Sequence, residues 1–140
     1  MEASSILQPV FVVGLLTVVM TVWMIATRVP AMTARGIDAQ EAQNTARIHD
    51  LLPPEITRIS NNYNHLFEQP TLFYAVALSI AVLGHVDTMH VGCAWLYAAL
   101  RITHSLVQAT VDIVMVRFGL FVLSWIALAT MIIRETIAVF

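Results

Sequence analysis

The sequence predicts an all-α integral membrane protein, whose single domain is a bundle of four transmembrane helices. The first observation is composition: 59% of the 140 residues are apolar and 11% are charged, whereas soluble domains have about 25% charged residues. The second is that four apolar segments are each long enough to cross about 30 Å of hydrocarbon. The third is that most polar residues gather in one long loop and in two stripes along the helices.

The first predicted helix covers residues 6–28 and is apolar along its length. It does not resemble a signal peptide, because Glu2 stands where a positive charge is expected and no A-x-A cleavage site follows. Arg28 is expected to end the helix, since Pro30 disfavours its continuation. Residues 29–53 mix charges of both signs and predict a solvated cytoplasmic loop against the membrane face.

The second predicted helix covers residues 54–84, and Pro54 suits its first position. Pro70 lies inside this helix, where it removes a backbone hydrogen bond and is expected to kink the axis. After a short turn, the third helix is predicted over residues 90–114 and the fourth over residues 117–139. No internal repeat or glycine-rich phosphate loop interrupts this order.

The arginines are distributed unevenly between the two sides of the predicted bundle. The positive-inside rule places the side with more of them in the cytoplasm. This orientation puts the first and third loops in the cytoplasm and both termini outside. The predicted cytoplasmic set is Arg28, Arg35, Arg47, Arg58 and Arg117, against Arg134 alone on the other side.

Two predicted helices carry polar stripes whose members follow spacings of three and four residues, so each stripe lies on one helix face. Because charged side chains are costly in hydrocarbon, the stripes are expected to face each other or a cavity. The second helix carries Arg58, Asn61, His65 and Glu68, with Asn64 beside them. The third carries Tyr97, Arg101, His104, Ser105, Gln108 and Asp112.

A rise of about 1.5 Å per residue places Glu68 level with Gln108 and His104, and Arg101 a turn or two deeper. Two interpretations stay open. In the first, a buried ion-pair network of Glu68, Arg101 and His104 fixes the bundle. In the second, the stripes line a pocket for a polar or anionic ligand. A third, a proton or ion path through the same three residues, is less favoured because inverted repeats and broken helices are lacking.

Two local motifs resemble those of the MAPEG superfamily, the membrane-associated proteins in eicosanoid and glutathione metabolism. The first is NYNHLFEQPTLFY at residues 62–74, and the second is LYAALRITHS at residues 96–105, followed by Arg117 and Phe118. With four helices and a long first loop, the resemblance covers nearly the whole chain. The chain is most similar to the small bacterial branch of this superfamily.

The resemblance implies a homotrimer in the bacterial inner membrane, with both termini periplasmic and glutathione bound between neighbouring subunits. It implies a glutathione transferase or peroxidase that acts on lipophilic electrophiles. Glu68 would match the glutamate that holds the amino end of glutathione. Arg117 would match the catalytic arginine near the thiol, where a guanidinium stabilises the thiolate. Arg28, Arg101 and His104 would match residues that line or brace the site.

Glutathione-using members carry an arginine seven residues before the glutamate and an asparagine three before it, where this chain has Asn61 and His65. Arg58 and Asn64 are candidates to compensate, and Gln108 replaces a third-helix tyrosine. No metal site is predicted. The predicted cofactor-binding set is Arg28, Arg58, Asn61, Asn64, His65, Glu68, Arg101, His104 and Gln108.

A second class of function is compatible with the same fold. A non-catalytic scaffold or accessory subunit would use the polar stripes to bind lipid or a protein partner. The expected partners of the first class are the lipid bilayer, further copies of this chain and a lipophilic small molecule. A net charge of −2 and the lack of a basic patch exclude nucleic acid.

Overall fold

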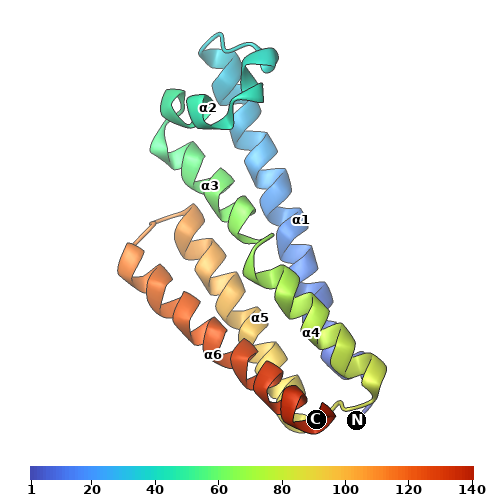
Figure 1. Ribbon diagram of the computed structural model, residues 1–140. Coiled ribbons are helices and arrows are strands. Elements are labelled where there is room, and N and C mark those ends of the chain that lie inside the picture. The colour runs from blue at the N-terminus through green and yellow to red at the C-terminus, as the bar shows by residue number, and fades with distance from the viewer.

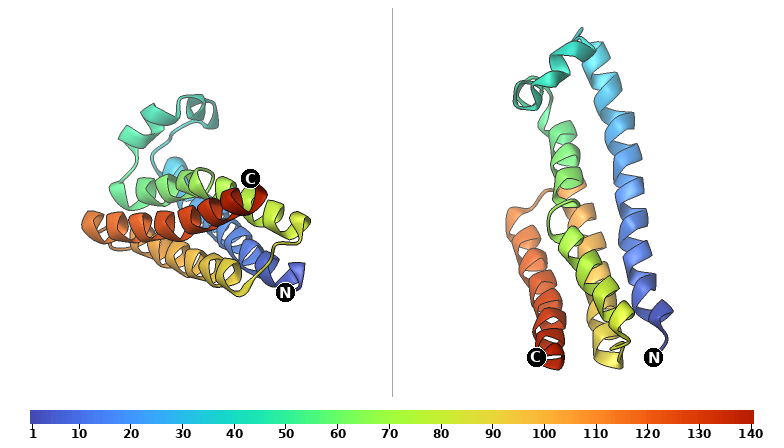
Figure 2. Two further views of the ribbon diagram at one scale, coloured as in Figure 1. Left: turned by 60° about the horizontal axis from the view of Figure 1, so that its bottom comes forward. Right: turned by 45° about the vertical axis from the view of Figure 1, so that its right-hand side comes forward.

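The computed structural model describes residues 1–140 and contains helices only. Four helical columns run side by side, with both termini at one end of the molecule and short helices at the other (Figure 1, Figure 2). The columns are α1 (Ala3–Ala34), α3 (Pro54–His65) with α4 (Gln69–Leu83), α5 (Thr88–Ala109) and α6 (Val114–Val139). The short elements are η1 (Ala39–Gln43) and α2 (Thr45–Leu51).

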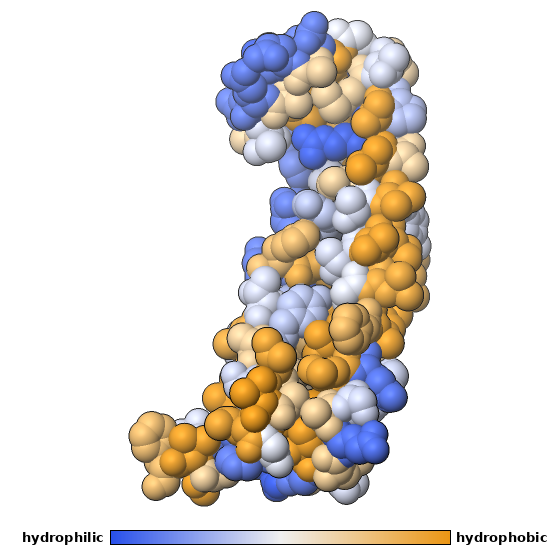
Figure 3. All heavy atoms as spheres, turned by 90° about the vertical axis from the view of Figure 1, so that its right-hand side faces the viewer, coloured by the Kyte–Doolittle hydropathy of each residue, from blue (hydrophilic) through white to orange (hydrophobic).

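Three segments are long and apolar enough to cross a membrane: α1, the α3–α4 column and α6. Helix α5, with 22 residues, is not among them because its polar stripe lowers its hydropathy, so the fourth predicted membrane-crossing helix is not confirmed. It completes the bundle by packing along α6. Apolar side chains cover much of the face in Figure 3, and hydrophilic ones gather at the end that holds η1 and α2. The chain is therefore an integral membrane protein.

Helix α1 continues to Ala34, so the predicted end at Arg28 was wrong. Its interior accepts Pro30, as it accepts Pro9, since each proline removes only one backbone N–H donor from a helix of 32 residues. The helix ends just before Gly36, whose φ of +64° lets the following N–H groups bond the last carbonyls. Only glycine adopts this left-handed conformation at little cost.

Residues 29–53 are not a loop throughout, which corrects the prediction for this segment. They hold the end of α1, then η1 and α2. Asp38 caps η1 and Asn44 caps α2, each accepting a hydrogen bond from a backbone N–H of the first turn. Ile48 and Leu52 are buried. Such short helices carry too few apolar residues to show a period in the sequence, so the pattern missed them.

The second column is broken rather than kinked near Pro70. Helix α3 ends at His65 and α4 begins at Gln69, which puts Pro70 in the first turn of α4. There the missing N–H of proline has no helical partner to lose. At the break the carbonyl of His65 accepts from the backbone N–H of Glu68 at 3.4 Å and from Arg101 of α5 at 3.3 Å. The break and α5 are thus tied together.

The hairpin between α5 and α6 also differs from the prediction. Helix α5 ends at Ala109 rather than at residue 114, and α6 begins at Val114, before the predicted start at residue 117. Asp112 between them has a φ of +53°, which a helix interior excludes. Its carboxylate pairs with Arg117 of α6. Arg117 therefore lies within α6 instead of opening it.

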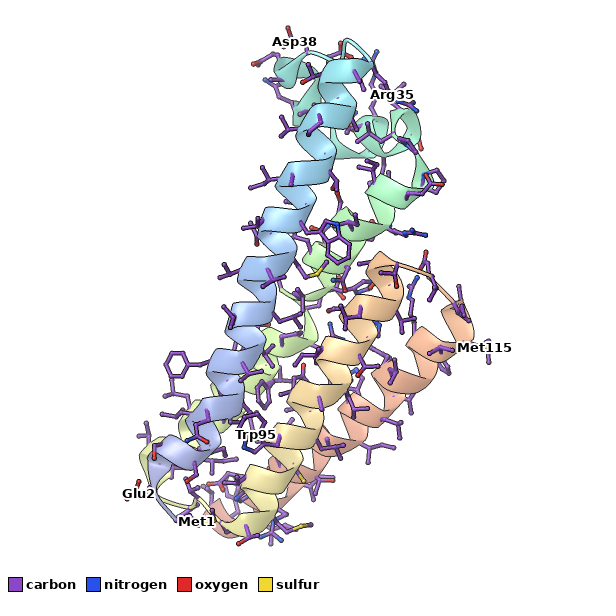
Figure 4. All side chains as sticks on the ribbon, turned by 180° about the vertical axis from the view of Figure 1, so that it is seen from behind. Met1, Glu2, Arg35, Asp38, Trp95 and Met115 are labelled. Atoms are coloured by element: carbon purple, nitrogen blue, oxygen red, sulfur yellow. The ribbon has the colours of Figure 1, made fainter.

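Columns α1 and α3 extend beyond the α5–α6 hairpin. Figure 4 shows Arg35 and Asp38 at the far end, with Met115 at the hairpin only part of the way along. Met1 and Glu2 lie at the opposite end. The short helices are therefore carried by α1 and α3 alone.

Two apolar clusters fill the bundle. The larger one joins α1, α4, α5 and α6 near the termini and includes Phe73, whose ring stacks on Tyr97 with centroids 4.2 Å apart. The smaller one includes Leu66 of the helix break and Ala109 at the end of α5. Between these clusters, the buried residues of α4 and α5 are mostly polar, namely Gln69, Arg101, His104, Ser105 and Gln108. The fold thus places a polar layer between two apolar ones.

Helix α5 begins at a carboxylate that gives the fold a pH-dependent contribution. Asp87 accepts a hydrogen bond from the backbone N–H of His90 at 2.7 Å and pairs with Arg134. This backbone hydrogen bond, helped by the charges of His90 and Arg134, holds the pKa of Asp87 below its ordinary value. The ionised carboxylate therefore stabilises the folded state.

The variant Asp87→Asn is expected to lower the free energy of unfolding by up to about 1 kcal/mol at pH 7, because solvent screens this half-exposed group. A carboxyl group whose pKa is lower in the folded state stabilises that state fully at pH values above its unfolded pKa. This stabilisation is lost as the pH falls through the folded pKa. The deficit should therefore begin to shrink as the pH falls below about 4 and vanish only below the lowered pKa of folded Asp87. Thermal unfolding in detergent measures it, with exposed Asp50→Asn as control; a deficit that is the same at all pH values contradicts the prediction.

Candidate functional site

The buried polar layer is organised around one amide. Arg101 is 1% exposed, and its guanidinium donates to Gln69 Oε1 at 3.4 Å as well as to the carbonyl of His65. The hydroxyl of Ser124 on α6 lies 3.1 Å from the same Gln69 oxygen and 2.8 Å from the carbonyl of Phe121 in its own helix. Gln69 and Ser124, to which the sequence analysis gave no role, thus join α4, α5 and α6 at one point.

Glu68 stands outside this layer. Its side chain is 65% exposed, and its carboxylate lies 3.0 Å from Nδ1 of His65. The buried network that would pair Glu68 with Arg101 is therefore not formed within the chain. The break between α3 and α4 is the physical reason, because it turns residue 68 away from the face that α3 presents to α5.

Arg101 lies level with the helix break, which corrects the predicted depth of the third-helix residues. The ring of His104 is 6.3 Å from the ring of His65, edge to face. The prediction counted a helical rise back from Arg117 through residues 110–113, which form a loop. The whole stripe on α5 is therefore shifted by several residues against α3 and α4.

One pocket lies among α1, α2 and α3, at the end away from the termini, with a volume of about 450 Å³. The predicted residues Arg28, Asn61 and Asn64 line it. His49 of α2 lines it as well, and the sequence analysis missed this residue because it missed α2. A guanidinium, an imidazole and two amides around one space are hydrogen-bond donors suited to a carboxylate ligand.

A second pocket, of about 210 Å³, lies where the end of α3 meets α5 and α6. Nδ1 of His104 and Nε of Arg117 are buried without a hydrogen-bond partner, and the rest of the Arg117 guanidinium pairs with Asp112. Cationic and aromatic walls therefore meet in one small space. The lining residues are His65, His104, Val114, Arg117, Phe118 and Phe121.

Four predicted site residues line neither pocket: Arg58, Glu68, Arg101 and Gln108. Gln108 is 1% exposed with Oε1 unpartnered, and Arg58 is half-buried with Nε unpartnered. Asn62, which received no role, is fully buried and neither amide atom has a partner. Each unpaired buried polar group costs about 1–3 kcal/mol. The burial of Asn62 could have been predicted from its spacing in the sequence, since it lies on the same helix face as buried Ile59 and Leu66.

Comparison with known families gave one match. The family model described as the MAPEG family matches residues 6–136, a range that includes both pockets and the buried polar layer. Searches of curated proteins and of solved structures gave no match. Because the family match spans nearly the whole chain and agrees with the two sequence motifs, this membrane protein belongs to the MAPEG family.

Proposed function

We propose that the protein is a glutathione transferase or peroxidase that acts on lipophilic electrophiles in the membrane. Family membership supports this class. The observation that carries the proposal is the exposed carboxylate of Glu68, which Arg101 does not neutralise. A carboxylate that served only to fix the bundle would be buried and paired. Glu68 is instead exposed, with His65 as its side-chain partner, and can be reached by a ligand.

The residues of the first pocket fit glutathione, which has a carboxylate at each end and an ammonium. Arg28 would bind a carboxylate through a bidentate pair, and the amides of Asn61 and Asn64 would add donors. Glu68, which does not line this pocket, would accept from the ammonium. The volume of about 450 Å³ lies within the range of about 300–1,000 Å³ that is usual for small-molecule sites.

Arg117 has the catalytic role in this proposal. Bound glutathione supplies a thiol whose sulfur forms a bond to an electrophilic carbon, while the leaving group departs with its electron pair and the proton goes to solvent. The guanidinium of Arg117 would favour the thiolate over the thiol. Phe118 and Phe121 offer an apolar wall to the lipophilic co-substrate.

The family resemblance supports a homotrimer for this chain, with the site between neighbouring copies. In that assembly, residues of the first pocket in one copy combine with residues of the second pocket in another. The excess of arginine at the η1–α2 end supports placing this end in the cytoplasm and both termini in the bacterial periplasm.

Glutathione binding tests the proposal. Arg28→Ala is expected to raise the dissociation constant about tenfold, because a charge-assisted hydrogen-bond pair is lost. Glu68→Gln should weaken binding by a similar factor, whereas exposed Arg47→Ala, which lies outside the pocket, should leave it unchanged. Calorimetry on the purified protein in detergent measures these constants. Wild-type protein that does not bind glutathione overturns the proposal, as does equal affinity of the Arg28 and Arg47 variants.

A non-catalytic scaffold or accessory subunit is the second candidate, and one observation favours it. Asp112 occupies part of the Arg117 guanidinium that a thiolate would need. A scaffold of this kind would bind lipid or a protein partner through the polar stripes. Conjugation of glutathione to a generic electrophile separates the two functions, because a scaffold adds nothing to the uncatalysed rate.

A further inference from the structure

The end of the bundle near the termini holds a buried carboxylate that the proposed glutathione site does not use. Glu135 of α6 is 9% exposed. Its Oε1 lies 2.7 Å from Nδ1 of His85, and its Oε2 is buried without a partner. The neighbouring cation Arg134 pairs with Asp87 instead. One oxygen of Glu135 therefore keeps its full capacity to accept hydrogen bonds.

Glu135 lines a groove of about 300 Å³ between α4 and α6. The groove is apolar except for Glu135, Ser79 of α4 and Thr136 of α6. Leu78 and Ile137, which precede and follow these hydroxyl residues in the chain, are exposed and apolar. The groove therefore lies on a face of the bundle that suits lipid, near the ends of both helices (Figure 1).

The polar groups of the groove are all hydrogen-bond acceptors. The hydroxyl of Ser79 donates to the carbonyl of Ala75 at 2.8 Å, and the hydroxyl of Thr136 donates to the carbonyl of Ile132 at 2.8 Å. Each hydroxyl has thereby used its one hydrogen and keeps lone pairs for a ligand. Glu135 adds a carboxylate to this lining, whose covered Oε2 has no partner, so the groove holds acceptors and no side-chain donor.

We propose that this groove binds a primary ammonium group that is attached to an apolar chain. An ammonium has three N–H donors and no acceptor, which matches a carboxylate oxygen and two hydroxyl oxygens. Its charge also compensates the buried carboxylate through a charge-assisted hydrogen bond. Val76 and Ile132 offer apolar surface to the chain of the ligand. A free lipophilic amine and a phospholipid with a primary ammonium head share this chemistry.

Octylamine is the probe for the site, titrated into the purified full chain in detergent and compared with octanol and octyltrimethylammonium. Octylamine should bind at least tenfold more tightly than either, because octanol lacks the charge and the quaternary ion lacks N–H donors. Glu135→Gln should weaken octylamine binding about tenfold and leave glutathione binding unchanged. Glu2→Gln, an exposed carboxylate at the same end, is the matched control and should have no effect.

Equal affinity for octylamine and octyltrimethylammonium would overturn the proposal, and this comparison needs no variant. Octylamine affinity that Glu135→Gln leaves unchanged would overturn it as well. Nanodiscs of mixed phosphatidylethanolamine and phosphatidylcholine then identify the source of the ammonium. Retention of phosphatidylethanolamine that Glu135→Gln abolishes assigns the site to a lipid headgroup. Octylamine binding without such retention assigns it to a free amine.

Discussion

Replacing Arg117 by alanine is expected to lower kcat/KM for conjugation of glutathione to a nitroaryl halide about 100-fold. A preorganised cationic donor beside a developing or existing negative charge contributes factors of about this size. Arg117 is the only arginine in the small pocket that also holds His65 and His104. The thiolate absorbance of the glutathione complex should fall together with the rate. An equal loss in Arg134→Ala, at the opposite end, would contradict a local role.

The pairing of Arg117 with Asp112 allows a sharper version of this test. Asp112→Asn removes the competing charge, and asparagine accepts the positive φ of this position. If Arg117 acts on the thiol, this variant should conjugate at least as fast as the wild type. If Arg117 serves only to hold the α5–α6 loop, Asp112→Asn should lose activity as Arg117→Ala does.

Replacing Arg101 by alanine is expected to lower the free energy of unfolding by about 3 kcal/mol. The variant loses the donors to Gln69 and to the carbonyl of His65, and it leaves a cavity where one of the largest buried side chains stood. Removing a buried charge works in the opposite direction. The lost hydrogen bonds and the cavity together outweigh this relief, so the net effect is destabilising.

Arg101→Met separates the contributions, because it fills much of the space without a charge. It should recover part of the stability that Arg101→Ala loses. Exposed Arg47→Ala should change the free energy by less than about 0.5 kcal/mol. Chemical unfolding in detergent, followed by circular dichroism, measures all three. If Arg101→Ala is as stable as the wild type, the link between α5 and the helix break does not contribute to the free energy of unfolding.

The sequence by itself determined the class of the protein and the faces of its helices. Apolar segments and stripes at spacings of three and four are properties of neighbouring residues, so no tertiary contact is needed to recognise them. The same spacing grouped Asn61 with Asn64 and put His104 on the buried face of α5. The motifs at residues 62–74 and 96–105 led to the family that the comparison confirmed.

Only the tertiary structure decided which polar residues meet. Helix α1 passes Pro30, α5 stops before Asp112, and the column breaks ahead of Pro70. The point at which a helix ends depends on a few backbone dihedral angles. A change at that point rotates or shifts every side chain that follows. The break turns Glu68 outward while Arg101 meets the carbonyl of His65. A stripe specifies the face of a helix, whereas its depth and its partners follow from where neighbouring helices begin and end.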